Sequence, residues 1–274
     1  MSEELKWYTP QEMLAWKPPT FKNIISQNIL TVQGLMMIYG HEGVGKSLIA
    51  MDLAYKIAQG LPWLGFDTIP TTICYFQSEI PQIMMKDRMD QYTTTNKINP
   101  QNLRVATDLY NKVDKGWGAT QLEKGFSAIR PGLGIIDPVN NSITASMVDD
   151  YQMGLFMDRI NMWRKDYKMG FILINHERKS EHKEGQSFHY GTNESFGARL
   201  SKAADTVIYI ESVMDGDPLI ELVIHFEKTR YGKSRIQPVE AILDRRNIML
   251  YRKESNRVLY SINMCQATGI QPNT

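Results

Sequence analysis

The residues with the clearest chemical meaning form one glycine-rich stretch early in the chain. In order, they are Gly40, His41, Glu42, Gly43, Val44, Gly45, Lys46, Ser47 and Leu48. The first eight fill every fixed position of the pattern G-x-x-x-x-G-K-S/T. In such a loop backbone N–H groups surround phosphates, the lysine reaches the β and γ oxygens, and the hydroxyl ligates Mg²⁺. The sequence therefore predicts a nucleoside triphosphate site, with ATP and Mg²⁺ as the expected ligands.

The segments on either side of this loop have the order that the motif requires. An apolar run at 34–39 predicts a buried strand, and apolar residues at helical spacing over 48–58 predict a helix. The glycines let the backbone come close to a ligand. The alternative is a chance glycine-rich turn, and the sequence of strand, loop and helix argues against it.

The composition is that of an ordinary globular protein. The chain has 274 residues, of which 42% are hydrophobic and 22% charged, and its formal net charge is +1. This charge gives no global attraction to nucleic acid or anionic lipid, so such binding needs a local patch. Two cysteines fit neither a disulfide framework nor a zinc site, and no apolar run approaches the roughly 20 residues of a membrane span. We expect a soluble, cytoplasmic protein without membrane contact.

Strand and helix patterns alternate after the loop, and strands end the chain. The expected strands lie at 71–76, 103–106, 132–136, 171–174 and 206–210, the expected helices at 81–91 and 147–167, and further antiparallel strands at 219–226, 236–243 and 248–251. This order predicts an α/β fold whose mainly parallel central sheet is flanked by helices and extended by antiparallel strands. Residues 1–30 are expected to be a lead-in segment with a possible subunit contact, and residues 31–274 one domain.

Two acidic residues at strand ends are candidates for the metal site and the general base. Asp137 ends the run at 132–136, where a second group near Mg²⁺ is needed, although an Asp before Pro138 could merely cap a turn. Glu79 follows the strand at 71–76, which we expect beside the phosphate-loop strand, and it could orient the attacking water. The alternative for Glu79 is a solvated acid at a helix N-terminus.

Together these motifs resemble those of the RecA-like ATPases, and among them the AAA_25-like cores of DnaB-like and plasmid RepA-type hexameric helicases. The resemblance covers residues 30–235. In that family the catalytic glutamate follows the second core strand, as Glu79 does here. AAA+ enzymes instead have an acidic pair at the position of Asp137 and Pro138. The resemblance implies a RecA-like core in which Lys46 and Glu79 serve ATP hydrolysis, and a homo-oligomer, expected to be a hexameric ring.

The resemblance also assigns roles to residues after the strand at 171–174. His176 matches the polar sensor that contacts the γ-phosphate, although a lone histidine at a strand end is more often structural. The polar stretch 177–191 matches a loop that touches single-stranded DNA. Its candidate DNA contacts are Arg178, Lys179, Lys183, His189 and Tyr190. The alternative is a solvated surface loop, because Glu181 and Glu184 offset much of the positive charge.

Lys228 and Arg230 form a K-x-R pair at the end of an expected strand. Side chains two residues apart on a strand point to the same face, so both could meet one phosphate cluster. DnaB-like helicases and RecA use basic pairs at this position to reach the γ-phosphate held by the next subunit. The resemblance thus implies a catalytic role in trans, and the alternative is an exposed basic hairpin.

These features predict an ATP-hydrolysing oligomeric motor that acts on single-stranded DNA, a replicative helicase of the RepA/DnaB-like type. One alternative is a RecA-like recombinase or mediator that uses ATP without separating strands. Another is a regulatory ATPase that does not act on DNA, or a small-molecule kinase. The K-x-R pair and the polar sensor favour hydrolysis between subunits over the kinase alternative.

Overall fold

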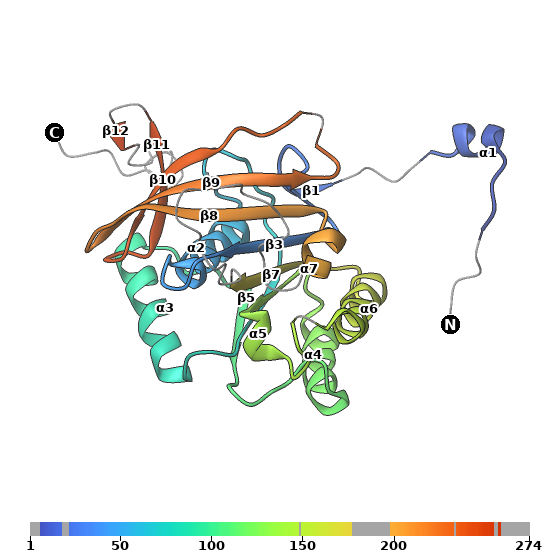
Figure 1. Cartoon of the computed structure of the whole chain (residues 1–274), viewed down its shortest axis with the longest axis horizontal. Helices are drawn as coiled ribbons and strands as arrows, with labels where there is room; N and C mark the ends of the chain where they lie inside the picture. Colours follow the sequence, from blue (N-terminus) through green and yellow to red (C-terminus); the bar gives the residue numbers. More distant parts are fainter. Residues whose placement is uncertain are drawn as a thin grey trace, which may run out of the picture.

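A computed structural model describes residues 6–17, 22–147, 149–176, 198–232, 234–254 and 257–258. Within these ranges a ten-stranded sheet has the order β12-β11-β10-β9-β8-β3-β7-β6-β4-β5 (Figure 1). The strands are β1 (Asn23–Ile25), β2 (Leu30–Thr31), β3 (Leu35–Gly40), β4 (Ile73–Gln77), β5 (Leu103–Thr107), β6 (Leu133–Asp137), β7 (Gly170–His176), β8 (Thr206–Asp215), β9 (Leu219–Thr229), β10 (Val239–Asp244), β11 (Met249–Glu254) and β12 (Arg257–Val258). Strands β1 and β2 form a separate small sheet.

The expected fold class is confirmed. The strands from β8 through β3, β7, β6 and β4 to β5 pair in parallel, whereas β8 to β12 pair antiparallel in sequence order. The helices are α1 (Pro10–Ala15), α2 (Lys46–Gln59), α3 (Gln82–Asn96), α4 (Gly116–Ile129), α5 (Val139–Ser142), α6 (Asp150–Asp166) and α7 (Ala198–Ala203). Among the described residues, no helix has the length and apolar character that a membrane span requires.

Helices pack on both faces of the parallel strands. Side chains alternate along β3, so Met36 and Ile38 join the core under α2, whereas Met37 and Tyr39 join the core under α6. Both faces are therefore buried, which explains why the parallel strands are nearly continuous apolar runs in the sequence. This burial fixes the position of β3, and with it the start of the phosphate loop.

Helix α4 was not among the expected helices. Its sequence contains three glycines, which lower helix propensity and hide an apolar stripe that includes Ala119 and Phe126. A Cβ at Gly118 would collide with the backbone carbonyl of Lys112, so this glycine permits a close approach of the preceding loop. Tertiary packing thus explains a glycine that weakens the local helix signal.

The first thirty residues divide into two parts. Ile24, Ile25 and Leu30, in and beside the β1–β2 hairpin, belong to the main core. Helix α1, in the lead-in segment, contains no buried residue and lies apart from the sheet in Figure 1. The packed part thus begins before residue 31, and α1 makes no contribution to the core.

Candidate nucleotide site

The residues predicted to act on a nucleotide meet at one edge of the sheet. Strands β3, β7, β6 and β4 all end there, and their registers place Gly40 opposite His176 and Gln77 opposite Asp137. Ligands of open parallel sheets bind at the carboxyl ends of the strands. This edge therefore brings together the phosphate loop, the expected metal ligand and the expected sensor.

One expected neighbour relation is wrong. Glu79 was expected to follow a strand beside the phosphate-loop strand, but β7 and β6 lie between β3 and β4. Strand β4 instead pairs with β6, so Glu79 follows the neighbour of the strand that ends in Asp137. The two strands between β3 and β4, β7 and β6, come later in the sequence than β4. Local sequence does not encode this crossover. Glu79 still lies at the same edge, and its charge acts on both Asp137 and His176.

The phosphate loop has the backbone that its glycines permit. Gly43 and Gly45 adopt φ angles of 83° and 91°, in the left-handed region that glycine tolerates best. A Cβ at Gly40 would stand 2.5 Å from the carbonyl oxygen of Ile210, so β3 and β8 leave no room for a side chain. Helix α2 begins directly after Gly45, so its unpaired N–H groups and positive dipole end face the loop.

Lys46 holds its ammonium group inside this loop. The side chain is buried, and Nζ donates hydrogen bonds to the carbonyl oxygens of Gly40, at 2.9 Å, and His41, at 2.6 Å. A buried cation held by two carbonyls is well placed to exchange them for phosphate oxygens, which form stronger charge-assisted bonds.

Asp137 and Ser47, the expected metal ligands, are in contact. The Ser47 hydroxyl donates to Oδ1 of Asp137 at 2.9 Å, which shows that both oxygens can approach one cation. Burial raises the pKa of Asp137 to about 6, because a charged carboxylate is costly away from water. A divalent cation offsets that cost, and Mg²⁺ commonly takes one or two protein oxygens together with phosphates and water. These two residues therefore fit Mg²⁺, and no group of three or more acidic, His or Cys ligands occurs in the ranges described.

Two residues of the site were missed from the sequence. The Tyr75 hydroxyl and the Gln77 amide, the latter at 3.3 Å, both donate to Oδ2 of Asp137. Gln77 also accepts a hydrogen bond from the backbone N–H of Glu79 at 2.6 Å. Gln77 thus links Asp137, the candidate metal ligand, to Glu79, the candidate base. A polar residue at the end of an apolar strand, two positions before Glu79, is the signal that could have identified it.

His176 lies half-buried beside the first residue of the loop. Burial lowers its pKa, and the nearby charge of Lys46 lowers it further against the opposing effect of Glu79 and Glu42. A lowered pKa favours a neutral imidazole at pH 7. His176 can therefore contact a γ-phosphate as a hydrogen-bond donor but does not add a full positive charge.

The K-x-R pair lies at the opposite edge of the sheet. Strand β9 runs antiparallel to β8, so its last residues lie near the start of β3. Lys228 Nζ donates to the carbonyl oxygens of Ser201 and Lys202, at 3.2 and 2.8 Å, and Arg230 pairs with Asp205 at 3.1 Å. The structure therefore does not bring this pair to the phosphate loop of its own chain.

The predicted DNA contacts lie outside the described residues. These are Arg178, Lys179, Lys183, His189 and Tyr190. The described chain ends at His176 before this stretch and resumes at α7. Their role remains a prediction from the sequence.

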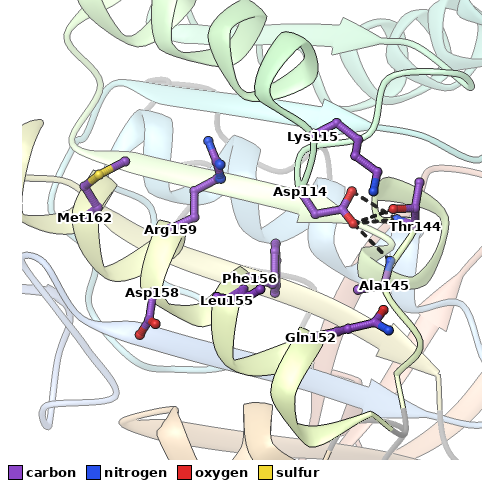
Figure 2. A pocket seen from close by; sticks show the side chains of 10 residues that line it. All are labelled: Asp114, Lys115, Thr144, Ala145, Gln152, Leu155, Phe156, Asp158, Arg159 and Met162. Carbon is purple, nitrogen blue, oxygen red and sulfur yellow. Dashed lines mark hydrogen bonds between the residues drawn. The ribbon is translucent and has the colours of Figure 1, made fainter.

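A separate groove of about 800 Å³ is lined by α6, the loop before α4 and the loop after α5 (Figure 2). At one end, Asp114 accepts hydrogen bonds from the backbone N–H groups of Thr144 and Ala145 and from the Thr144 hydroxyl at 2.7 Å. This carboxylate joins the loop before α4 to the loop that follows α5, a few residues after Asp137.

Replacing Asp114 with Ala is expected to lower the free energy of unfolding by about 1–3 kcal/mol, because the bonded N–H groups lose their acceptor. Urea unfolding monitored by circular dichroism measures this change. Asp158→Ala, an exposed acid of the same groove, is the control and should change stability by less than about 0.5 kcal/mol. Equal stability of the two variants would contradict the assigned role of Asp114.

The fold and the site together define a class of protein. A phosphate loop, the buried Asp137 and the half-buried His176 share the carboxyl edge of a parallel sheet that continues into antiparallel strands, and this is the fold of the RecA-like P-loop class. Residues 3–182 match the family model AAA_25, described as an AAA domain. Since the match covers more than half of the chain, the chain belongs to this family.

Solved structures support the fold at low sequence identity. A KaiC-like protein of Pyrococcus horikoshii aligns with a TM-score of 0.55 and 12% identity, over 82% of this chain and 91% of that one. A DnaB-like replicative helicase, solved in a study of its interactions with primase, aligns with a TM-score of 0.59 and 12% identity, over 80% of this chain but only 57% of its own. The flagellar accessory protein FlaH of Methanocaldococcus jannaschii gives 0.51 and 14%, over 81% and 90%. No curated protein sequence matches the chain.

Proposed function

We propose that the protein is an ATP-hydrolysing oligomeric motor that acts on single-stranded DNA, a cytoplasmic replicative helicase of the RepA/DnaB-like type. The observation that carries the hydrolytic part is the meeting of Lys46, Asp137 and Glu79 at one edge of the sheet. The similarity to a DnaB-like replicative helicase supports the DNA part. The similarity to a KaiC-like protein and to FlaH supports a regulatory ATPase as one alternative. The RecA-like fold is also compatible with a recombinase or mediator, the other alternative.

In the proposed mechanism the loop binds the phosphates through its N–H groups and Lys46. Ser47 and Asp137 would hold Mg²⁺, which supplies positive charge against the phosphate oxygens. Glu79 accepts a hydrogen bond from the attacking water, orients it and takes its proton. Neutral His176 donates a hydrogen bond to the γ-phosphate. Because γ-phosphate contacts depend on the nucleotide state, His176 can report that state to the loop that follows it.

The K-x-R pair fits an assembly in which subunits meet head to tail. Lys228 and Arg230 lie at the edge opposite the phosphate loop, so in a ring that edge can face the loop of the next subunit. Asp205 holds Arg230 and also accepts hydrogen bonds from Arg164, at 2.9 Å, and from the N–H of Leu35, at 3.0 Å. Asp205 would thus keep other partners if Arg230 moved to a neighbour. We propose a hexameric ring on this basis.

Residues 6–17 are the proposed additional subunit contact. Trp7 and Leu14 are 86% and 88% exposed, and the Thr9 and Glu12 capping box stabilises the start of α1 without help from the core. A helix with exposed apolar side chains and no buried residue is suited to contact another subunit.

Replacing Arg230 with Ala is expected to leave ATP binding unchanged and to lower turnover roughly 10³-fold or more, because a cation in trans would be lost from the transition state. Mixing this variant with Lys46→Ala should restore turnover. Some interfaces then join the intact phosphate loop of an Arg230→Ala subunit to the intact Arg230 of a Lys46→Ala subunit. With random assembly the recovery is up to about a quarter of the normal rate. Arg235→Ala, which removes an exposed arginine of the same segment, is the control. A mixture as inactive as its components would argue against action in trans.

Strand displacement separates the three functions. A forked duplex with a single-stranded tail should be unwound when ATP and Mg²⁺ are present and remain intact with a non-hydrolysable analogue. DNA-stimulated turnover without displacement would favour the recombinase or mediator. Turnover without any response to DNA would favour the regulatory ATPase.

A further inference from the structure

A cavity of about 280 Å³ lies between helix α4 and strands β4, β5 and β6. It is on the face of the sheet away from α2, and most of the side chains that line it are apolar, among them the rings of Phe76, Phe126 and Phe171. Its volume is close to the lower end of the range for small-molecule sites, roughly 300–1,000 Å³. The residues of the nucleotide edge, Gln77 and Asp137, do not line it.

The cavity reaches the surface at β5, the edge strand of the sheet. Side chains alternate along this strand, and Leu103 and Val105 pack with the core under α2, so Arg104 and Ala106 point to the side of α4. Both of these residues line the cavity, and both are exposed. Helix α4 packs on the neighbouring strand β4. The α4 side of β5 is therefore left uncovered and forms the entrance.

Gly125 of α4 leaves the space under the helix open. It lies one helical turn from both Leu122 and Ile129, and all three line the cavity. A Cβ at Gly125 would meet no atom within 4 Å, so no close approach of another segment requires a glycine at this position. Glycine inside a helix is less stable than alanine. This glycine thus weakens α4 without relieving a clash, and what it provides is free volume in the cavity.

The lining suits an aromatic ligand better than it suits water. Burial raises the pKa of Cys74 to about 11, so its thiol is neutral at pH 7 and adds no charge to the lining. An ordered water needs about two to four polar partners, which an apolar lining does not supply. Phe126 and Phe171 already meet edge to face, and a ligand ring can extend this arrangement. Since benzene fits an apolar cavity of about 150 Å³, a cavity of about 280 Å³ has room for two fused rings.

Arg104 places a cation at the entrance. Its charge acts on the Cys74 thiol, so the guanidinium lies near the lining. Arg104 donates from Nη1 to the carbonyl oxygens of Gln101 and Leu103, the latter at 3.3 Å. These partners carry no charge and do not occupy Nε or Nη2. A guanidinium with these donors can bind a carboxylate through charge-assisted hydrogen bonds.

We propose that the cavity under α4 binds a small aromatic molecule that carries one anionic group. The rings lie between β4 and α4, beside Phe76 and below Gly125, and the anionic group pairs with Arg104 at the entrance. Apolar burial supplies most of the affinity, and the cation selects an anion over a neutral molecule of the same shape. The site is separate from the phosphate loop, so binding requires neither ATP nor Mg²⁺.

Calorimetric titration of the full chain with naphthalene-1-carboxylate and its neutral counterpart naphthalene-1-methanol tests this assignment. The carboxylate should bind at one site with a Kd below about 1 mM, and the neutral compound more weakly. Arg104→Gln should weaken carboxylate binding roughly 3-fold to 30-fold and leave the neutral compound unchanged. Gly125→Leu fills the cavity, so it should abolish binding of both compounds and raise the urea concentration at the midpoint of unfolding. Gly116→Leu and Arg235→Gln change an exposed glycine at the start of α4 and an exposed arginine outside the cavity, and neither should alter binding.

Three results would overturn the proposal. The first is the absence of saturable carboxylate binding by the unaltered chain up to about 1 mM. The second is binding that persists in Gly125→Leu, which would place the ligand elsewhere. The third is equal carboxylate affinity in Arg104→Gln and the unaltered chain, which would remove the anionic contact. Circular dichroism shows whether each variant is folded, and Ala106→Leu fills the cavity from β5 if Gly125→Leu is not.

Discussion

Glu79→Gln is expected to bind ATP normally and to hydrolyse it about 10²–10⁴ times more slowly, because the amide cannot take a proton from water. The substitution keeps the shape of the side chain, and the Gln77 contact to residue 79 involves only its backbone N–H. Binding should therefore be unaffected. Phosphate release under saturating ATP measures turnover, and a fluorescent ATP analogue measures binding.

Asp87→Asn is the matched control for this variant. Asp87 is an exposed acid on α3, the helix that follows Glu79, so its loss changes the charge by the same amount away from the site. The control should hydrolyse ATP at the normal rate. Persistent turnover in Glu79→Gln would show that the base lies elsewhere on the edge.

Lys46→Ala is expected to remove ATP binding or turnover while the chain stays folded, with kcat/KM lower by roughly 10²–10³ or more. Lys46 Nζ donates to the loop carbonyls of Gly40 and His41, and Lys46 belongs to neither apolar core. Equilibrium ATP binding and phosphate release are the measurements. The thermal unfolding midpoint without nucleotide should change little.

Lys124→Ala provides the comparison, since Lys124 is an exposed lysine on α4, which contributes no residue to the nucleotide site. It should bind and hydrolyse ATP as the unaltered chain does. Normal ATPase activity in Lys46→Ala would contradict the assignment of the phosphate loop.

The sequence predicted the parallel part of the fold well, because strands buried on both faces are apolar runs that need no wider context. The phosphate loop was predicted equally well, because the conformation that requires its glycines and Lys46 is set by residues adjacent in the sequence. Helix α4 was missed because Gly118 serves contact with the loop before it, which only tertiary structure shows. The neighbour of β4 was wrong because strand order depends on crossovers between distant segments.

The site was predicted less completely than the fold. Asp137, Glu79 and His176 follow strands, and the carboxyl ends of parallel strands meet, so their convergence could be expected. Gln77 had a signal as a polar residue at the end of an apolar strand, but Tyr75 had none, because its bond to Asp137 depends on the pairing of β4 with β6.

The most direct test is the rate of ATP hydrolysis with and without single-stranded DNA, measured across a range of protein concentrations. If the protein is an oligomeric motor with composite sites, DNA should strongly stimulate turnover, and the rate should rise more steeply than linearly with protein concentration as subunits assemble. A rate that is indifferent to DNA and linear in protein concentration would contradict the proposed motor.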